Sequence, residues 1–149
     1  MIADDHPAVR KGVCTILHSR ADIEVCGEAA DGREAIDKAL ELKPDLLILD
    51  LTMPVMGGFE AAVELLKLRE RLDHRGTIVP DIPIIFYSMH EGSQLIRHAQ
   101  EIGVRGFVSK RNITDTLLDA VDAVVLRRQT FFPDSSDTNE KLSLGERAH

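Results

Sequence analysis

One alternation runs through most of this chain: a short apolar run, then apolar residues at helical spacing, repeated five times. The runs are bounded by chain breakers and are apolar on both faces, which is typical of buried parallel strands. Serial strand–helix units give a parallel sheet with helices on both faces, because each crossover is right-handed. The sequence therefore predicts an α/β sandwich with strands at residues 1–3, 23–29, 46–49, 83–87 and 106–108.

Two segments depart from this alternation. Residues 69–82 are polar and longer than a usual connection, and we expect an extended helix end followed by an exposed loop. After Arg128 the composition becomes polar and rich in chain breakers. We therefore predict one domain over residues 1–128 and a linker or disordered tail over residues 129–149. The domain should fold without the residues that follow Pro133.

Polar side chains with useful chemistry stand at the ends of four predicted strands. Asp4 and Asp5 follow the first strand, Asp50 ends the third, Ser88 follows the fourth, and Lys110 comes shortly after the fifth. Ligands and chemistry collect at the carboxyl edge of open α/β sheets. Any one of these residues alone would more often be structural or solvated. Their coincidence at one edge of the sheet favours a site.

The carboxylates predict a divalent cation. Asp4, Asp5 and Asp50 would converge if the first and third strands are neighbours, and three ionised carboxylates need a counter-charge. Mg²⁺ fits better than Ca²⁺, because it needs only one or two carboxylates, with waters and a phosphate oxygen completing its shell. Lys110 adds a second cation and Ser88 a hydroxyl. A carboxylate in such surroundings can attack phosphorus and hold the resulting acyl phosphate.

The combination resembles a response-regulator receiver domain of two-component systems, through Asp4-Asp5, Asp50 with Met53-Pro54 and Gly57, Ser88, and Phe107 three residues before Lys110. The resemblance covers roughly residues 1–128 and implies a flavodoxin-like doubly wound fold, with strand order 2-1-3-4-5 and five helices. It implies that Asp50 accepts a phosphoryl group from the phosphohistidine of a sensor histidine kinase. It also implies a cytoplasmic signalling domain that assists its own phosphotransfer and is not otherwise an enzyme.

The resemblance further assigns a metal site. Mg²⁺ would bind the side chains of Asp5 and Asp50 and the backbone carbonyl of Thr52. Asp4 would take part through a water molecule.

A switch is implied as well. Lys110 would contact one phosphoryl oxygen, Ser88 would move to hydrogen-bond another, and Phe107 would follow Ser88 inward. Output would then be read on the face formed by the fourth helix, the fifth strand and the fifth helix. The same face is the candidate surface for a homodimer, and the sequence leaves the oligomeric state open.

Other residues resemble one subfamily, the LuxR-type (NarL-like) transcriptional regulators: Asp4-Asp5-His6-Pro7, Gly12-Val13 and Gly27-Glu28-Ala29. Phe131-Phe132-Pro133 resembles the linker after their receiver, and Leu142-Ser143 faintly resembles the start of their helix-turn-helix domain. This implies control of transcription through an output domain that is absent from this chain. We therefore expect no specific DNA binding by the chain alone.

Several alternatives stay open beside the receiver hypothesis. An aspartyl-phosphate enzyme of the haloacid dehalogenase phosphatase type would need a second Asp two residues after the nucleophile, where Thr52 stands. A phosphorylation-independent interaction domain is disfavoured by the intact acidic set. His6 could be a metal ligand, although a partly exposed position at the start of a helix is favoured. Arg111 stands where many receivers have a proline after a cis bond. A cis Lys110–Arg111 bond is disfavoured on energetic grounds, but the family fold could still enforce one, so the sequence leaves the isomer open.

Composition excludes several other classes. The net charge of −7 disfavours a broad electrostatic grip on nucleic acid, and only 4% of residues are aromatic, too few for a base-stacking surface. No apolar stretch approaches the roughly 20 residues of a membrane helix. Cys14 and Cys26 match no metal or redox spacing, and we expect reduced cysteines in the core.

Overall fold

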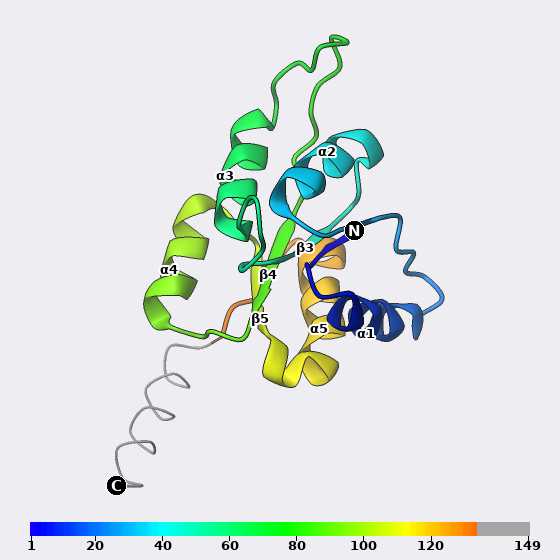
Figure 1. Ribbon diagram of the computed structural model, residues 1–149, viewed down its shortest axis with the longest axis vertical. Helices are drawn as coiled ribbons and strands as arrows, with labels where there is room; N and C mark the ends of the chain where they lie inside the picture. Colours follow the sequence, from blue (N-terminus) through cyan, green and yellow to red (C-terminus); the bar gives the residue numbers. More distant parts are fainter. Residues whose placement is uncertain (134–149) are drawn as a thin grey trace, which may run out of the picture.

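The computed structural model describes residues 1–133 and confirms the predicted sandwich (Figure 1). All strand pairs are parallel, and the five strands of the sheet lie in the order β2-β1-β3-β4-β5. The strands are β1 (Ile2–Ala3), β2 (Glu28–Ala29), β3 (Leu47–Asp50), β4 (Ile84–Ser88) and β5 (Gly106–Ser109). The α-helices are α1 (Pro7–His18), α2 (Gly32–Leu42), α3 (Gly58–Leu68), α4 (Ser93–Ile102) and α5 (Ile113–Val121). This is the flavodoxin-like topology expected from the sequence.

Each face of the sheet has its own hydrophobic core. Helices α1 and α5 pack on one face, and helices α2, α3 and α4 cover the other (Figure 1). Because side chains alternate along a strand, Ile48 of β3 belongs to the first core and Leu47 and Leu49 to the second. Because the strands are apolar and buried on both faces, polar side chains can be placed only at the strand ends.

The second strand is much shorter than predicted. We expected a strand over residues 23–29, but only Glu28 and Ala29 pair with β1. Ile23 and Val25 still pack against the core beneath α1 and α5. The apolar pattern of this segment therefore reflects burial of these side chains and not strand pairing. Since β1 itself has only two residues, it offers no backbone with which a longer β2 could pair.

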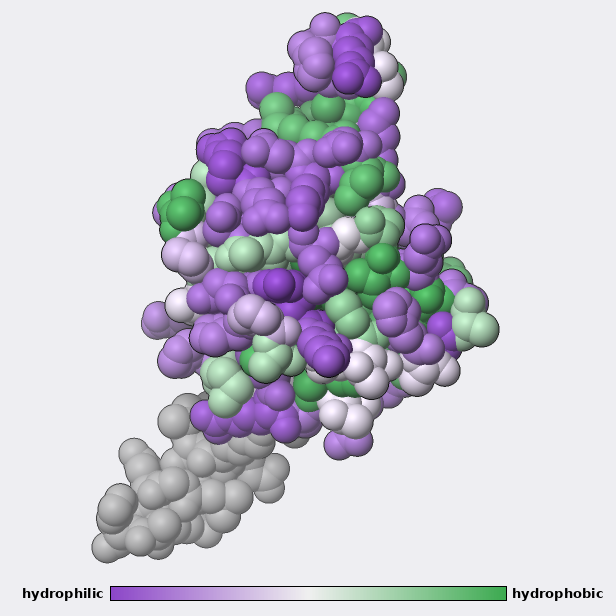
Figure 2. Space-filling view, turned by 45° about the vertical axis from the view of Figure 1, so that its right-hand side comes forward, coloured by the Kyte–Doolittle hydropathy of each residue, from purple (hydrophilic) through white to green (hydrophobic). Residues whose placement is uncertain are grey.

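Residues 69–82 contain no helix extension, so this part of the prediction is wrong. Helix α3 ends at Leu68, and the chain then folds back on itself through an isolated antiparallel bridge between Leu72 and Ile78. Glu70 N–H donates to the Val79 carbonyl at 3.0 Å, and Val79 is buried. The loop stands out at the top of Figure 1, and hydrophobic side chains gather just below its tip in Figure 2. Leu72 and Ile78 are both exposed.

The chain beyond α5 returns to the edge of the sheet. A π-helical turn (Asp122–Leu126) follows α5, and Phe131 then forms a parallel bridge with Gly106 of β5. Phe107 N–H donates to the Phe131 carbonyl at 2.8 Å, and Phe131 N–H donates to the Arg105 carbonyl at 2.9 Å. Residues up to Phe132 therefore contact the predicted domain, whereas the predicted tail beyond Pro133 lies outside the described residues.

Three smaller expectations can also be compared with the structure. Between Met1 and Pro133 no peptide bond is cis, so the Lys110–Arg111 bond is the energetically favoured trans isomer. Cys14 and Cys26 are both free, but Cys26 is exposed, so its placement in the core was wrong. None of the helices formed by residues 1–133 is long and apolar enough to cross a membrane.

Candidate functional site

The sheet order and the two-residue period of its strands place four polar side chains in one row. In the order of the strands, the row runs from Asp4 just past β1, through Asp50 of β3 and Tyr87 of β4, to Lys110 just past β5. Each lies an even number of residues from an apolar residue of the core beneath α1 and α5, so all four face that side. Tyr87 is the register partner of Asp50.

Asp50 is a buried carboxylate beside an amine. Only 3% of the residue is exposed, and its Oδ2 lies 3.1 Å from Lys110 Nζ. The Thr52 N–H donates to Oδ1 at 3.3 Å. Burial raises the pKa of Asp50 above its usual value, although the nearby ammonium of Lys110 opposes the change.

Asp4 is buried more completely and is saturated with donors. Its Oδ1 accepts the His6 N–H at 2.8 Å, and its Oδ2 accepts both the Tyr87 hydroxyl at 2.5 Å and Lys110 Nζ at 3.1 Å. Burial alone would raise the pKa of Asp4, but the hydrogen bonds from Tyr87, His6 and Lys110 together lower it. Asp4 is thus a fixed negative charge that shares the amine of Lys110 with Asp50.

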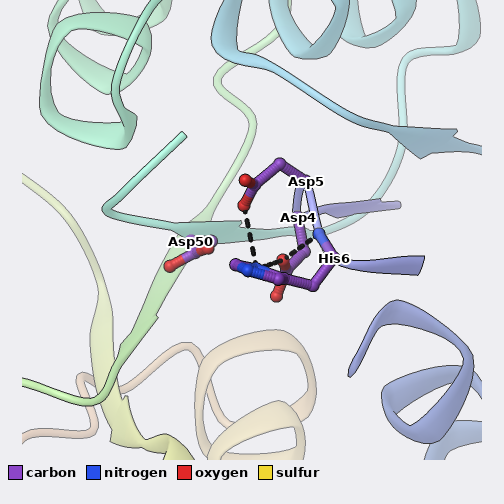
Figure 3. Close-up of side chains that lie close together, drawn as sticks. All are labelled: Asp4, Asp5, His6 and Asp50. Atoms are coloured by element: carbon purple, nitrogen blue, oxygen red, sulfur yellow. Dashed lines mark hydrogen bonds and ion pairs between the residues drawn. The ribbon is translucent and has the colours of Figure 1, made fainter. Parts of the chain in front are cut away.

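Asp5 differs from its neighbour in that one oxygen lacks a donor. Oδ1 of Asp5 is buried and makes no hydrogen bond to any residue in the described part of the chain. It lies 3.1 Å from His6 Nδ1, in a geometry that makes no hydrogen bond. In Figure 3 Asp5 and His6 lie together in the loop after β1, and Asp50 lies to one side of them on β3.

These residues form a group that could hold a metal ion. One ligand atom each from Asp4, Asp5, His6 and Asp50 lie within 4.8 Å of one another. A buried carboxylate oxygen without a donor is unfavourable unless a cation or water satisfies it. The donor set is mainly carboxylate oxygen, which suits a hard cation such as Mg²⁺. His6 is two-thirds exposed at the start of α1, as the sequence favoured, although its ring lies closer to the group than expected.

Ser88 and Phe107 lie on the other side of the sheet. Ser88 is buried at the end of β4, and its Oγ accepts the His90 N–H at 3.0 Å. Phe107 is buried in the core beneath α2, α3 and α4. The structure thus brings Asp4, Asp5, Asp50 and Lys110 together and gives Phe107 no contact with them. Tyr87 was missed from the sequence, where it was treated only as a strand residue.

The loop after β3 approaches the site closely. Gly58 begins α3 with its N–H bonded to the Leu51 carbonyl at 3.0 Å. A Cβ at this position would lie 2.2 Å from the backbone oxygen of Asp50. Only glycine fits so close to that backbone. Gly58, next to the Gly57 of the sequence motif, is therefore what allows α3 to start directly against Asp50.

A doubly wound sheet with a buried aspartate, further carboxylates and a lysine at its carboxyl edge defines an aspartyl phosphoacceptor domain. A sequence model described as "Response regulator receiver domain" matches residues 1–122. The chain belongs to this family.

Curated relatives and solved structures agree with this assignment. The response regulator protein VraR of Staphylococcus aureus is 34% identical over 134 residues, which are 90% of this chain and 59% of the relative. A two-component response regulator of the LuxR family from Aurantimonas sp. SI85-9A1 is 31% identical, with a TM-score of 0.77, covering 100% of this chain and 96% of that one. The receiver domain of the NarL regulator from Mycobacterium tuberculosis is 28% identical, with a TM-score of 0.64, covering 79% and 90%. The chain therefore spans about three-fifths of the length of its curated relatives.

Proposed function

We propose that this chain is a phosphoacceptor switch in which Asp50 takes a phosphoryl group from the phosphohistidine of a sensor histidine kinase. The observation that carries the proposal is the buried pair of a carboxylate and an amine, with 3.1 Å between Asp50 Oδ2 and Lys110 Nζ. Membership of the receiver family supports the same chemistry. The cytoplasmic location stays a prediction.

In the transfer, a carboxylate oxygen of Asp50 forms a bond to phosphorus while the phosphorus–nitrogen bond of the kinase histidine breaks. The electron pair of the broken bond stays on the imidazole nitrogen, and the ring leaves as neutral imidazole because its other nitrogen carries a proton. The acyl phosphate carries nearly two negative charges. Lys110, already within 3.1 Å of Asp50, needs only a small movement to pair with a phosphoryl oxygen.

The residues around Asp50 suit Mg²⁺, which would supply positive charge to the phosphoryl oxygens. Asp5 would be a direct ligand, because its buried Oδ1 has no hydrogen-bond donor among the described residues. Asp50 and the backbone carbonyl of Thr52 would complete the protein ligands. Asp4 would act through water, since both of its oxygens already accept hydrogen bonds from the protein. One similar structure carries the description of a CheX–CheY–BeF3–Mg²⁺ complex from Borrelia burgdorferi, at 26% identity and a TM-score of 0.71.

The switch would begin at Ser88. Its Oγ accepts the His90 N–H, and after a movement of the side chain its own hydroxyl hydrogen would be donated to a phosphoryl oxygen. Phe107 is already buried in the core beneath α2, α3 and α4, so the movement of Ser88 would hold Phe107 in this inward position. Since Phe107 N–H bonds to the Phe131 carbonyl, a shift of β5 would reach the chain beyond α5. We propose the α4–β5–α5 face as the output and homodimer surface, and control of transcription through a LuxR-type domain outside this chain.

Phosphorylation at Asp50 can be tested directly. The protein is treated with acetyl phosphate and Mg²⁺, the acyl phosphate is trapped chemically, and the labelled residue is mapped by mass spectrometry. We expect a label on Asp50 and none in Asp50→Asn. Asp45→Asn is the matched control, because Asp45 is an exposed carboxylate just before the same strand and should leave labelling unchanged. Labelling that persists in Asp50→Asn would refute the proposal.

A further inference from the structure

Tyr87 lies beneath the site and contacts two of its residues. Its side chain is fully buried, and no other tyrosine occurs in the chain. The hydroxyl donates to Asp4 Oδ2 at 2.5 Å, and Lys110 Nζ lies 4.7 Å from the centre of the ring. The ring thus lies under the amine while its hydroxyl reaches the carboxylate that binds the amine.

Asp4 Oδ2 is the atom at which these contacts meet. It accepts both the Tyr87 hydroxyl and the Lys110 ammonium, which is also 3.1 Å from Asp50 Oδ2. Burial, together with the hydrogen bond to Asp4, raises the pKa of Tyr87, so the phenol stays protonated and remains a donor. The amine is therefore shared between two carboxylates, one of which is partly satisfied by the phenol.

We propose that Tyr87 is a positioning residue for the phosphorylation of Asp50, because its hydroxyl weakens the hold of Asp4 on Lys110 and leaves the ammonium available to Asp50. This inference rests on the proposed role of Asp50. Without the hydroxyl, Lys110 would be the sole donor to Asp4 Oδ2. A buried carboxylate oxygen with one donor binds that donor more strongly. The ammonium would then move toward Asp4 and away from the incoming phosphoryl group.

The decisive variant is Tyr87→Phe, which keeps the ring and removes only the hydroxyl. We expect the rate constant for labelling of Asp50 by acetyl phosphate, at saturating Mg²⁺, to fall about 10-fold, the size of one lost hydrogen bond to a charged group. The dissociation constant for Mg²⁺, measured by calorimetry, should change less than about threefold, because Asp5 and Asp50 are untouched. Ile85→Val is the control, since it removes a methyl group from the same strand and the same core. It should lower stability without lowering the rate constant.

A second comparison ties the effect to the amine. In a Lys110→Ala background, Tyr87→Phe should lower the labelling rate less than about twofold, because the group it positions is gone. An equal, 10-fold loss in both backgrounds would overturn the proposal. So would a Tyr87→Phe protein that labels at the parental rate, or one that loses Mg²⁺ affinity and rate in equal measure. Absence of labelling in the parent protein would instead refute the proposed function.

Discussion

A pair of glycine-to-alanine changes tests how closely α3 is built against the phosphoacceptor strand. Gly58 and Gly12 both lie in helices, but their surroundings are opposite. A Cβ at Gly58 would lie 2.2 Å from the Asp50 carbonyl oxygen and 2.9 Å from the Leu51 Cα. A Cβ at Gly12, on the exposed side of α1, would meet nothing within 4 Å. The same substitution should therefore have opposite effects on stability.

The size of the clash sets the expected loss. At 2.2 Å, carbon and oxygen are about 1 Å inside van der Waals contact, and the obstacle is backbone on both sides. Overpacking a core usually lowers the free energy of unfolding by about 1–3 kcal/mol, and a backbone obstacle places Gly58→Ala at or above the upper end. We expect a melting temperature lower by roughly 10 °C. Gly12→Ala should raise the free energy of unfolding by about 0.5–1 kcal/mol, because alanine loses less conformational entropy in a helix.

Urea unfolding followed by circular dichroism, without Mg²⁺, measures both changes. Labelling of Asp50 supplies a second measurement, because any relief of the clash must displace the backbone of Asp50 or Leu51. Gly58→Ala should label more slowly than Gly12→Ala at equal fractions of folded protein. A Gly58→Ala protein as stable as the parent would show that α3 does not start against the backbone of Asp50.

Two further predictions concern the charge of the site and the end of the domain. Because the pKa of Asp50 is raised in the folded state, its ionisation opposes folding at neutral pH. This cost shrinks as pH falls through the folded pKa and is gone below the unfolded pKa of about 3.9. Asp50→Asn should therefore be more stable than the parent at pH 7 in EDTA, with an advantage that shrinks toward pH 3 in urea titrations. An advantage that grows on acidification would contradict this sign. Ending the chain after Arg128 should lower the free energy of unfolding by about 2–4 kcal/mol, since it removes the two backbone hydrogen bonds that join Phe131 to Arg105 and Phe107, and the packing of Phe131 and Phe132. Ending the chain after Pro133 keeps these contacts. Equal stability of the two truncated proteins would show that Phe131 and Phe132 add nothing to the domain.

Much of the site could be predicted from sequence because the argument needs only the position of each side chain along the chain. Each reactive side chain stands at the carboxyl end of its own apolar run, and a parallel sheet brings those ends to one edge. That argument needs only the strand ends, so Asp4, Asp50 and Lys110 were found without knowing the length of any strand. The very short first strand, predicted at residues 1–3, does not weaken this argument.

The predictions that were wrong concern two segments whose structure depends on contacts with other parts of the chain. Residues 23–29 have a strand-like pattern, but β1 limits the pairing to two residues. Residues 69–82 look like a helix end followed by a loop, but Val79 is buried and bonds back to Glu70 and Arg71. Local periodicity carries no information about which partner is present, so it cannot fix either segment.

Tyr87 was missed for a different reason: the prediction did not consider which face of the sheet each side chain of the fourth strand points to. Its place beside Asp50 follows from the register of β3 and β4, and its facing follows from the two-residue period. A phenol at this position of the strand could have been recognised as facing the site once the register was known. Phe86, one residue earlier, faces the opposite core and packs against Phe59 in a tilted arrangement, with 4.9 Å between the ring centres. Adjacent aromatic residues of β4 thus serve opposite faces, and a change at Tyr87 reaches the carboxylates while a change at Phe86 reaches the core around Phe107.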